Sequence, residues 1–155
     1  MSQPPATSPL FDLLRENDTG VLVTLKKDGR PQLSNVSFTY DEPSRTIRIS
    51  ATADRAKTRN LRRDPRATFY VTTPDMGAYL VTEAEAELTP TAADPHDATV
   101  EELIEVYRAI GGEHPDWDEY RAAMVADRRL VIRLPIDHAY GWGRSQGGTS
   151  GAVER

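Results

Sequence analysis

Apolar and polar residues alternate with a period of two along most of this chain, which predicts a protein built mainly of β-strands. We expect strands over residues 20–26, 31–40, 46–50, 67–72, 78–88, 130–134 and 136–142. Turn-forming residues separate the first three, with Asp28-Gly29 after the first strand and residues 41–44 after the second. These three strands are therefore predicted to pair as an antiparallel meander.

A helical period of three to four residues appears in fewer places. Ser8 can cap a short helix that ends near Asn17. Residues 97–110 repeat apolar side chains on one face and end at Gly111-Gly112, and a second amphipathic helix is expected over residues 116–127. The pair forms a helical excursion between strands.

A short basic helix is expected between the third and fourth strands, within residues 55–66. Asp54 can serve as its N-cap and Pro65 stops its propagation. The resulting order predicts a mainly β fold with added helices, in which an antiparallel sheet rolls into a small barrel. We expect one domain over residues 9–142, with disordered tails at residues 1–8 and 143–155.

Composition narrows the class of protein. The 155 residues include no Cys and carry a formal net charge of −5. A chain without Cys or a long apolar run suits the cytoplasm and not a membrane, and an acidic chain is a poor nucleic-acid binder. His96, His114 and His138 lack metal-ligand spacing, so no metal site is expected.

The basic helix concentrates charge in this acidic chain, because six of the nineteen Lys and Arg residues lie within residues 55–66. Arg55 and Arg59 are four residues apart on a helix, where like charges repel each other. This repulsion and the unpaired amides of the first turn favour a phosphate beside Arg55, Lys57 and Thr58. A solvated basic face is the alternative that the sequence leaves open.

Motifs for covalent catalysis are missing from the sequence. It has no Gly-x-Ser-x-Gly elbow, no Gly-rich phosphate loop and no thiol, so the catalytic residues stay unknown. A protein with an anion site and few reactive groups of its own is expected to take its chemistry from a cofactor.

Two stretches resemble a known family. The first is Gly20-Val21-Leu22-Val23-Thr24-Leu25 with Asp28-Gly29-Arg30-Pro31-Gln32-Leu33-Ser34-Asn35-Val36, and the second is Arg55-Ala56-Lys57-Thr58-Arg59-Asn60-Leu61 within residues 50–66. In this order they closely resemble the FMN-binding split β-barrel proteins related to pyridoxamine 5′-phosphate oxidase. The similarity is greatest to the branch that uses coenzyme F420, and it extends through residues 113–117 to residues 134–136.

The resemblance implies a homodimer with a cofactor site in each groove between subunits. It implies a cofactor phosphate against one group of residues, namely Ser50, Arg55, Ala56, Lys57 and Thr58. It implies a deazaflavin ring along a second group, namely Gln32, Ser34, Asn35 and Val36, approached by Met76 and Ala78 of the other subunit. Asn60, His138 and Trp142 match the family less closely.

The function implied is an F420-dependent reductase that passes hydride to a small, conjugated organic acceptor. F420 carries an acidic polyglutamate tail, which the surplus cations Arg59, Arg62 and Arg63 could steer. FMN has a phosphate without this tail, so an FMN-dependent enzyme of the same fold is one alternative. A cofactor-binding module without an acceptor site is the other.

Overall fold

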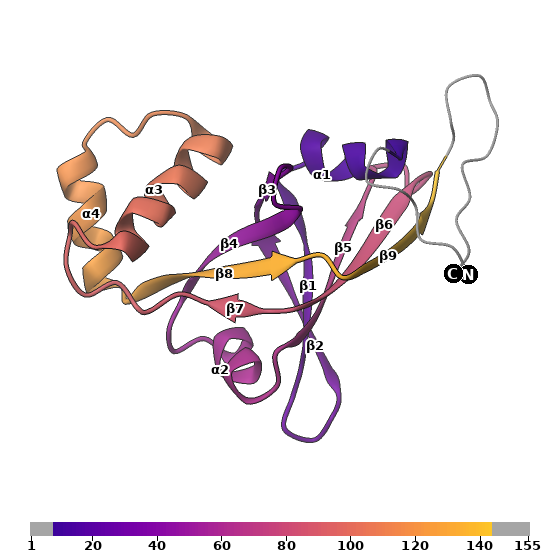
Figure 1. Cartoon of the computed structure of the whole chain (residues 1–155), viewed down its shortest axis with the longest axis horizontal. Coiled ribbons are helices and arrows are strands. Elements are labelled where there is room, and N and C mark those ends of the chain that lie inside the picture. Colours follow the sequence, from indigo (N-terminus) through magenta and orange to yellow (C-terminus); the bar gives the residue numbers. More distant parts are fainter. Residues whose placement is uncertain (1–7, 144–155) are drawn as a thin grey trace.

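The structure is a computed structural model, and it describes residues 8–143. Two antiparallel sheets form the body of the molecule (Figure 1). The larger sheet has the order β2-β1-β5-β6-β9, with β1 (Thr19–Leu25), β2 (Pro31–Ser37), β5 (Arg66–Thr72), β6 (Tyr79–Glu85) and β9 (His138–Trp142). The smaller has the order β3-β4-β8-β7, with β3 (Thr39–Asp41), β4 (Thr46–Thr52), β7 (Glu87–Leu88) and β8 (Arg129–Pro135).

The mainly β prediction is confirmed, and the strand pairing of β1 with β2 agrees with the turn at residues 28–29. The predicted meander is wrong, because residues 31–40 do not form one strand. The chain leaves β2 at Phe38, whose side chain is buried with its ring centroid 4.8 Å from that of Phe69. Burial of this ring turns the chain into the other sheet, so β3 pairs with β4 and not with the β1–β2 hairpin.

A second predicted strand, residues 78–88, is divided in the same way. Its two parts, β6 and β7, belong to different sheets, and Ala86 lies between them. The amide of Ala86 donates to the carbonyl of Pro65 at 2.7 Å, so the break is held by a backbone hydrogen bond. Breaks of this kind let two sheets share one core, as a split barrel requires.

The main core lies between the inner faces of the two sheets. Alternate residues of the strands are almost completely buried there, among them Leu22, Ile47, Ile49, Phe69, Leu80, Leu130 and Ile132. Each such side chain contributes about 1.5–3 kcal/mol by leaving water. The N-terminal segment, η1 (Pro9–Phe11) and α1 (Asp12–Glu16), adds Leu10, Phe11 and Leu14 to this core, which confirms the helix expected after Ser8.

The helical excursion forms α3 (Ala98–Gly111) and α4 (Trp117–Ala126), as predicted. Figure 1 shows the pair at one side of the smaller sheet, where α3 contacts β8 and β4. Apolar residues of α3 and α4 pack with Val131 in a second core. The carboxylates of Asp97 and Asp116 cap the two helices by accepting from Val100 and Glu119 amides.

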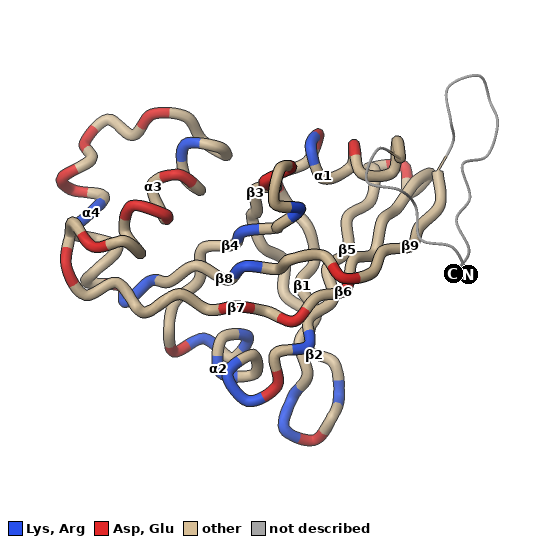
Figure 2. The backbone as a smooth tube through the Cα atoms, viewed as in Figure 1, with Lys and Arg blue, Asp and Glu red and all other residues tan. Residues whose placement is uncertain are grey.

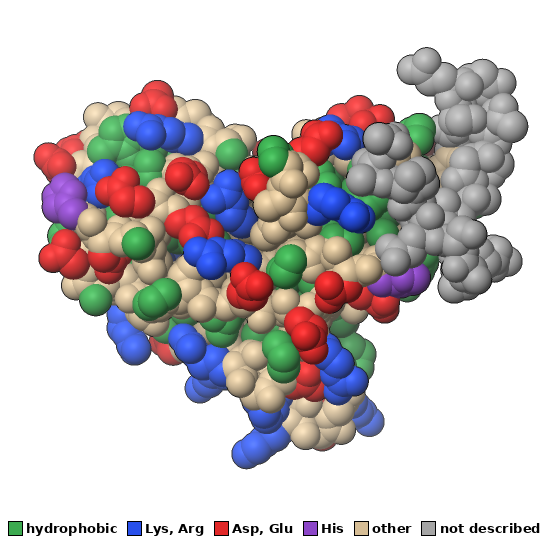
Figure 3. All heavy atoms as spheres, viewed as in Figure 1, with side chains coloured by type: hydrophobic (Ala, Val, Ile, Leu, Met, Phe, Trp, Pro, Cys, Tyr) green, Lys and Arg blue, Asp and Glu red, His purple; other side chains and the backbone are tan. Residues whose placement is uncertain are grey.

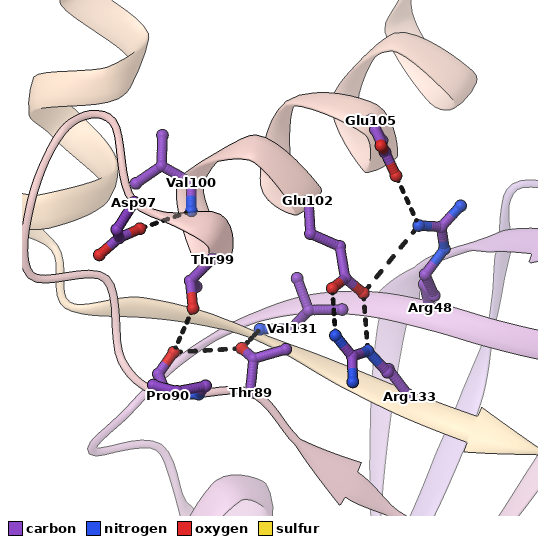
Figure 4. Close-up of polar contacts among 10 residues, drawn as sticks. All are labelled: Arg48, Thr89, Pro90, Asp97, Thr99, Val100, Glu102, Glu105, Val131 and Arg133. Carbon is purple, nitrogen blue, oxygen red and sulfur yellow. Dashed lines mark hydrogen bonds and ion pairs between the residues drawn. The ribbon is translucent and has the colours of Figure 1, made fainter.

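Charged pairs also attach α3 to the smaller sheet (Figure 4). Arg133 of β8 donates through Nε to Glu102 at 2.9 Å, and Arg48 of β4 donates to Glu105 at 2.9 Å. Glu102 lies 4.0 Å from Arg48 as well, so one carboxylate serves two arginines. These contacts neutralise Arg48 and Arg133, two strand cations that would otherwise lie unpaired beneath α3.

The basic helix is present as α2 (Ala56–Arg63), but its N-cap is Arg55, so the prediction for Asp54 is wrong. The Arg55 side chain does not cap the helix. Instead the end of β4 holds the first turn, because the Thr52 carbonyl accepts from the Arg55 amide at 3.2 Å and from the Thr58 hydroxyl at 2.9 Å. A carboxylate at the N-cap would neutralise the partial positive charge of the helix N-terminus. Because the N-cap is Arg55, this charge is not neutralised by the capping residue.

Among residues 8–143, no helix is long and apolar enough to cross a membrane. Residues 1–7 and 144–155, which make up nearly all of the two predicted tails, lie outside the described residues. Ser8 caps η1 through its hydroxyl, and Gly143 is buried in the domain.

Candidate cofactor-binding site

The first turn of α2 meets the end of the smaller sheet. The strand register sets Thr52 of β4 opposite Arg129 of β8, beside the segment that leads into the helix. A cavity of about 480 Å³ opens there, lined by Thr52, Asp54, Arg55, Asp127 and Arg129. The structure therefore adds Arg129 to the cations that the sequence placed at this helix.

Three cations lie at this end of the molecule, where the carboxylates of Asp54 and Asp127 line the same cavity. Within residues 8–143, Arg55, Lys57 and Arg129 form no ion pair. Burial lowers the pKa of Lys57 from its ordinary value, and the charges of Arg55 and Arg129 lower it further. An anion would relieve this repulsion, so the residues present fit a phosphate group.

Hydrogen bonding points the same way. Arg129 donates to the hydroxyl of Ser50 at 3.3 Å, whereas its buried Nε has no hydrogen-bond partner in the described chain. A buried donor without an acceptor is costly, and an anionic oxygen is a partner that would remove the cost. Ser50, Lys57 and Arg55 are thus gathered with Arg129 on one side of the α2 first turn.

Thr58 and Ala56 can offer a phosphate only backbone groups. The Thr58 side chain is completely buried and its hydroxyl hydrogen is given to the Thr52 carbonyl. A hydroxyl that has donated its hydrogen cannot donate it to a phosphate. The amides of residues 56–58 have no intrahelical acceptor, so Ala56 and Thr58 can offer backbone N–H groups.

Charge is unevenly distributed over the whole molecule. Figure 2 shows Lys and Arg along α2 and the β1–β2 hairpin, whereas Asp and Glu follow α3 and α4. In Figure 3 the cationic side chains gather at the lower end of the visible face, over the same two elements. An anionic ligand is attracted to this end before it makes any contact.

The residues expected along the cofactor ring lie on β2, at an edge of the larger sheet. Successive side chains of a strand point to opposite faces. Gln32, Ser34 and Val36 are half-buried on the face that β2 shares with the core, whereas Asn35 is exposed on the other face. The four residues therefore cannot present their side chains to one ring together, although the edge strand also offers backbone groups.

Asn60 is buried and its side chain is already occupied by the protein. Its amide nitrogen donates to the Thr24 hydroxyl and to the Gln32 carbonyl oxygen, both at 3.0 Å. Its oxygen accepts from Arg63 at 3.1 Å. Asn60 therefore connects α2 with β1 and β2, and any influence on a ligand passes through Gln32.

Met76 and Ala78 lie far from the cation cluster within one chain. β5 leads away from α2, and its seven residues extend the chain by about 20 Å before the turn that holds Met76. The turn is fixed by the Thr73 hydroxyl, which donates to Asp75 at 2.6 Å and accepts from the Ala78 amide at 3.3 Å. Met76 lies in this turn with a φ of 59°, and it is 73% exposed.

His138 and Trp142 lie on β9, on the face of the larger sheet opposite the main core. Neither residue lines the cavity beside the first turn of α2, and His138 instead lines another cavity with Leu25 and Arg66. Arg129 was missed by the sequence because its only signal is an arginine just before a strand. Its position depends on the pairing of β8 with β4, which are about eighty residues apart in the chain.

Comparison with known proteins gives two findings. A family model described as pyridoxamine 5′-phosphate oxidase matches residues 7–143. Among solved structures, an F420 reductase is 26% identical, with a TM-score of 0.66, over 85% of this chain and 96% of that one.

Two further structures are similar in fold. A conserved hypothetical protein from Mycobacterium tuberculosis is 22% identical with a TM-score of 0.70, over 92% of this chain and 90% of that one. A heme binding protein from Mycobacterium smegmatis is 18% identical with a TM-score of 0.65, over 98% of this chain and 60% of that one. The predicted split-barrel fold class is thereby confirmed, and the fold alone is compatible with more than one cofactor.

Proposed function

Since this chain belongs to the pyridoxamine 5′-phosphate oxidase family, we propose that it is an oxidoreductase that uses coenzyme F420. Members of the family are generally oxidoreductases that bind flavins. The printed name of one similar structure, an F420 reductase, supports a deazaflavin here, although identity is only 26%. The substrate is a small, conjugated and electron-poor organic molecule that accepts hydride.

The observation that carries the proposal is the set of unpaired cations at the first turn of α2. Arg55, Lys57 and Arg129 hold the phosphate of the cofactor, with the backbone amides of residues 56–58 as further donors. The exposed cations Arg59 and Arg62 lie on the same helix, toward solvent. They favour a ligand with additional negative charge beyond its phosphate, which F420 has and FMN lacks.

We propose that the protein acts as a homodimer, as proteins of this family often are. Within one chain the whole of β5, about 20 Å of extended strand, separates the end of α2 from the turn that holds Met76, which favours a site that takes Met76 from a second chain. The outer face of the larger sheet offers an apolar surface for pairing. Its half-exposed and exposed members include Val21, Val23, Leu33, Tyr70, Tyr79, Tyr140 and Trp142.

When bound, the reduced deazaflavin supplies the hydride, and the protein supplies position and shielding. The cation cluster would hold the phosphate end of the cofactor, and the side chains of Gln32, Ser34 and Val36 would border the site of its ring. Met76 of the second subunit would exclude water from that site. A reduced deazaflavin held there would supply hydride to a double bond of the acceptor, and solvent or a bound water would supply the proton.

One titration tests the choice of cofactor. The purified protein is mixed with F420 and, in parallel, with FMN, and fluorescence is followed. We expect tighter binding of F420, whereas preferential binding of FMN would overturn the F420 assignment. Oxidation of reduced F420 by enones, quinones or tetrapyrroles then tests catalysis, since binding without any turnover favours a cofactor-binding module.

A further inference from the structure

A chain of hydrogen bonds runs from the last turn of α2 to the edge strand β2. Arg63 donates through Nη2 to the Leu25 carbonyl at 2.7 Å and to the Asn60 oxygen at 3.1 Å. Asn60 donates through Nδ2 to Thr24 and to the Gln32 oxygen, each at 3.0 Å. The chain therefore links a cation on the surface to a side chain beside the proposed ring site.

The direction of these hydrogen bonds is fixed at one end. A guanidinium can only donate and is always charged at ordinary pH, so the atom of Asn60 that faces Arg63 must be its oxygen. The amide nitrogen of Asn60 then faces Gln32, and Gln32 must present its oxygen in return. The oxygen and nitrogen positions of both side-chain amides are therefore fixed by the charged donor, whereas isolated Asn and Gln side chains can have either orientation.

This orientation leaves the side-chain amide nitrogen of Gln32 pointing away from Asn60. In the part of the chain that the structure describes, the Gln32 amide nitrogen makes no hydrogen bond, while its oxygen is committed to Asn60. Both of its hydrogens are therefore available to a ligand. Gln32 can recognise a carbonyl oxygen or a ring nitrogen without hydrogen, and it disfavours a ligand that offers a donor at the same place.

We propose that Arg63 and Asn60 are positioning residues, which orient the Gln32 amide as a donor toward an acceptor atom of a conjugated heterocyclic ligand. This rests on the proposed function, in which the deazaflavin ring lies along β2. Arg63 is thereby assigned a role apart from the neighbouring Arg59 and Arg62, for which the described chain gives no side-chain hydrogen bond. Arg63 fixes the orientation of Gln32 through Asn60 and does not itself contact the ligand.

The orientation can be tested without any ligand, by NMR of side-chain amides in the whole protein. We expect the Asn60 amide hydrogens to exchange about tenfold more slowly than those of Gln32, because both of the former are donated. In Arg63→Met the Asn60 amide group can rotate, so the difference in exchange rate between Asn60 and Gln32 should become smaller. Arg63→Lys keeps a charged donor beside the Asn60 oxygen, so this variant should retain most of that difference. Equal exchange in the wild-type protein would overturn the proposal.

The effect on the ligand is tested by a double-mutant cycle on F420 affinity. Gln32→Met should weaken binding about tenfold, as expected for one lost hydrogen bond. Arg63→Met should cost a similar factor, and the double variant little more, because both changes remove the same donor. Arg30→Met, which removes an exposed arginine of the hairpin, is the control and should change affinity less than twofold.

Independent effects that multiply in the double variant would mean that Arg63 acts on the ligand without Gln32, for example through its charge, and the proposal would be wrong. Unfolding curves of each variant keep loss of fold apart from loss of contact. If the wild-type protein binds neither F420 nor FMN, the proposed function fails. The hydrogen-bond chain is then judged by the amide exchange experiment alone, where unprotected Asn60 hydrogens would refute it.

Discussion

Two arginines of the same strand, β8, have opposite surroundings. Arg133 lies under α3 and donates to Glu102, which also lies 4.0 Å from Arg48 of the neighbouring strand. Arg129, four residues earlier, lies under the first turn of α2 and forms no ion pair within residues 8–143. α3 carries the carboxylates that pair with Arg133 and Arg48, whereas α2 brings further cations toward Arg129.

The difference separates charges that serve the fold from charges that are left for a ligand. Glu102 compensates the charge of the two strand arginines, although the buried Nε of Arg48, like that of Arg129, has no hydrogen-bond partner in the described chain. At α2, burial and then the charges of Arg55 and Arg129 lower the pKa of Lys57, which is a cost in the free protein. Stability should therefore respond to changes on the α3 side, and ligand affinity to changes on the α2 side.

The largest expected effect is on the α3 side. Glu102→Ala leaves Arg48 and Arg133 partly buried without this partner, which should lower the free energy of unfolding by about 3 kcal/mol. Urea denaturation measures the loss. Glu105→Ala is the control, because its side chain is 63% exposed and should cost less than about 1 kcal/mol. A loss of F420 affinity as large as the loss of stability would break the comparison.

On the α2 side, Lys57→Ala should weaken F420 binding by about 1.5–3 kcal/mol, because a charge-assisted hydrogen bond to the phosphate is lost. The free energy of unfolding should stay the same or rise slightly, since repulsion by Arg55 and Arg129 is relieved. Fluorescence titration and denaturation measure the two quantities. Unchanged affinity in a folded variant would remove Lys57 from the site.

Alkaline pH should act on the α3–α4 side through Tyr120. Burial raises the pKa of Tyr120 to about 12, and its hydroxyl donates to the Leu103 carbonyl at 3.1 Å. The unfolded chain ionises near its ordinary pKa of about 10, so it loses the proton first and stability falls between these values, by about 2 kcal/mol. In Tyr120→Phe, the free energy of unfolding measured between pH 9 and 11.5 should fall less steeply with pH than in the wild-type protein, because this ionisation is absent. An identical slope in both proteins would contradict the role of burial.

The smallest effect is expected from Arg62, which lies exposed beyond the phosphate site. Arg62→Ala should weaken F420 binding less than about threefold, and only at low salt, because a distant cation steers an acidic tail without direct contact. FMN binding should not change. An equal loss for both cofactors would show that Arg62 acts on the phosphate they share.

The sequence was sufficient for most elements of the fold. The period of two located the strands, and Asp97 and Asp116 marked the starts of α3 and α4. The breaks at Phe38 and Ala86 were missed, because an alternating pattern continues through both. Which sheet a segment joins depends on burial in a shared core, and local periodicity does not contain this information.

The candidate site was only partly accessible from the sequence. Arg55 and Lys57 were found because they are neighbours in a dense run of charge. Arg129 joins them through the pairing of strands about half the chain apart. The hydrogen bonds of the Asn60 side chain depend on Arg63 and Gln32 together. Contacts between distant segments need the fold, whereas contacts within one helix need only its period.

A native mass spectrum of the protein as isolated from its own host tests the central claim most directly. We predict a dimer that carries two molecules of F420, with lengths of the polyglutamate tail resolved as separate masses. Lys57→Ala from the same host should retain the dimer and lose most of the cofactor. A monomer, or a dimer that carries FMN in place of F420, would contradict the account.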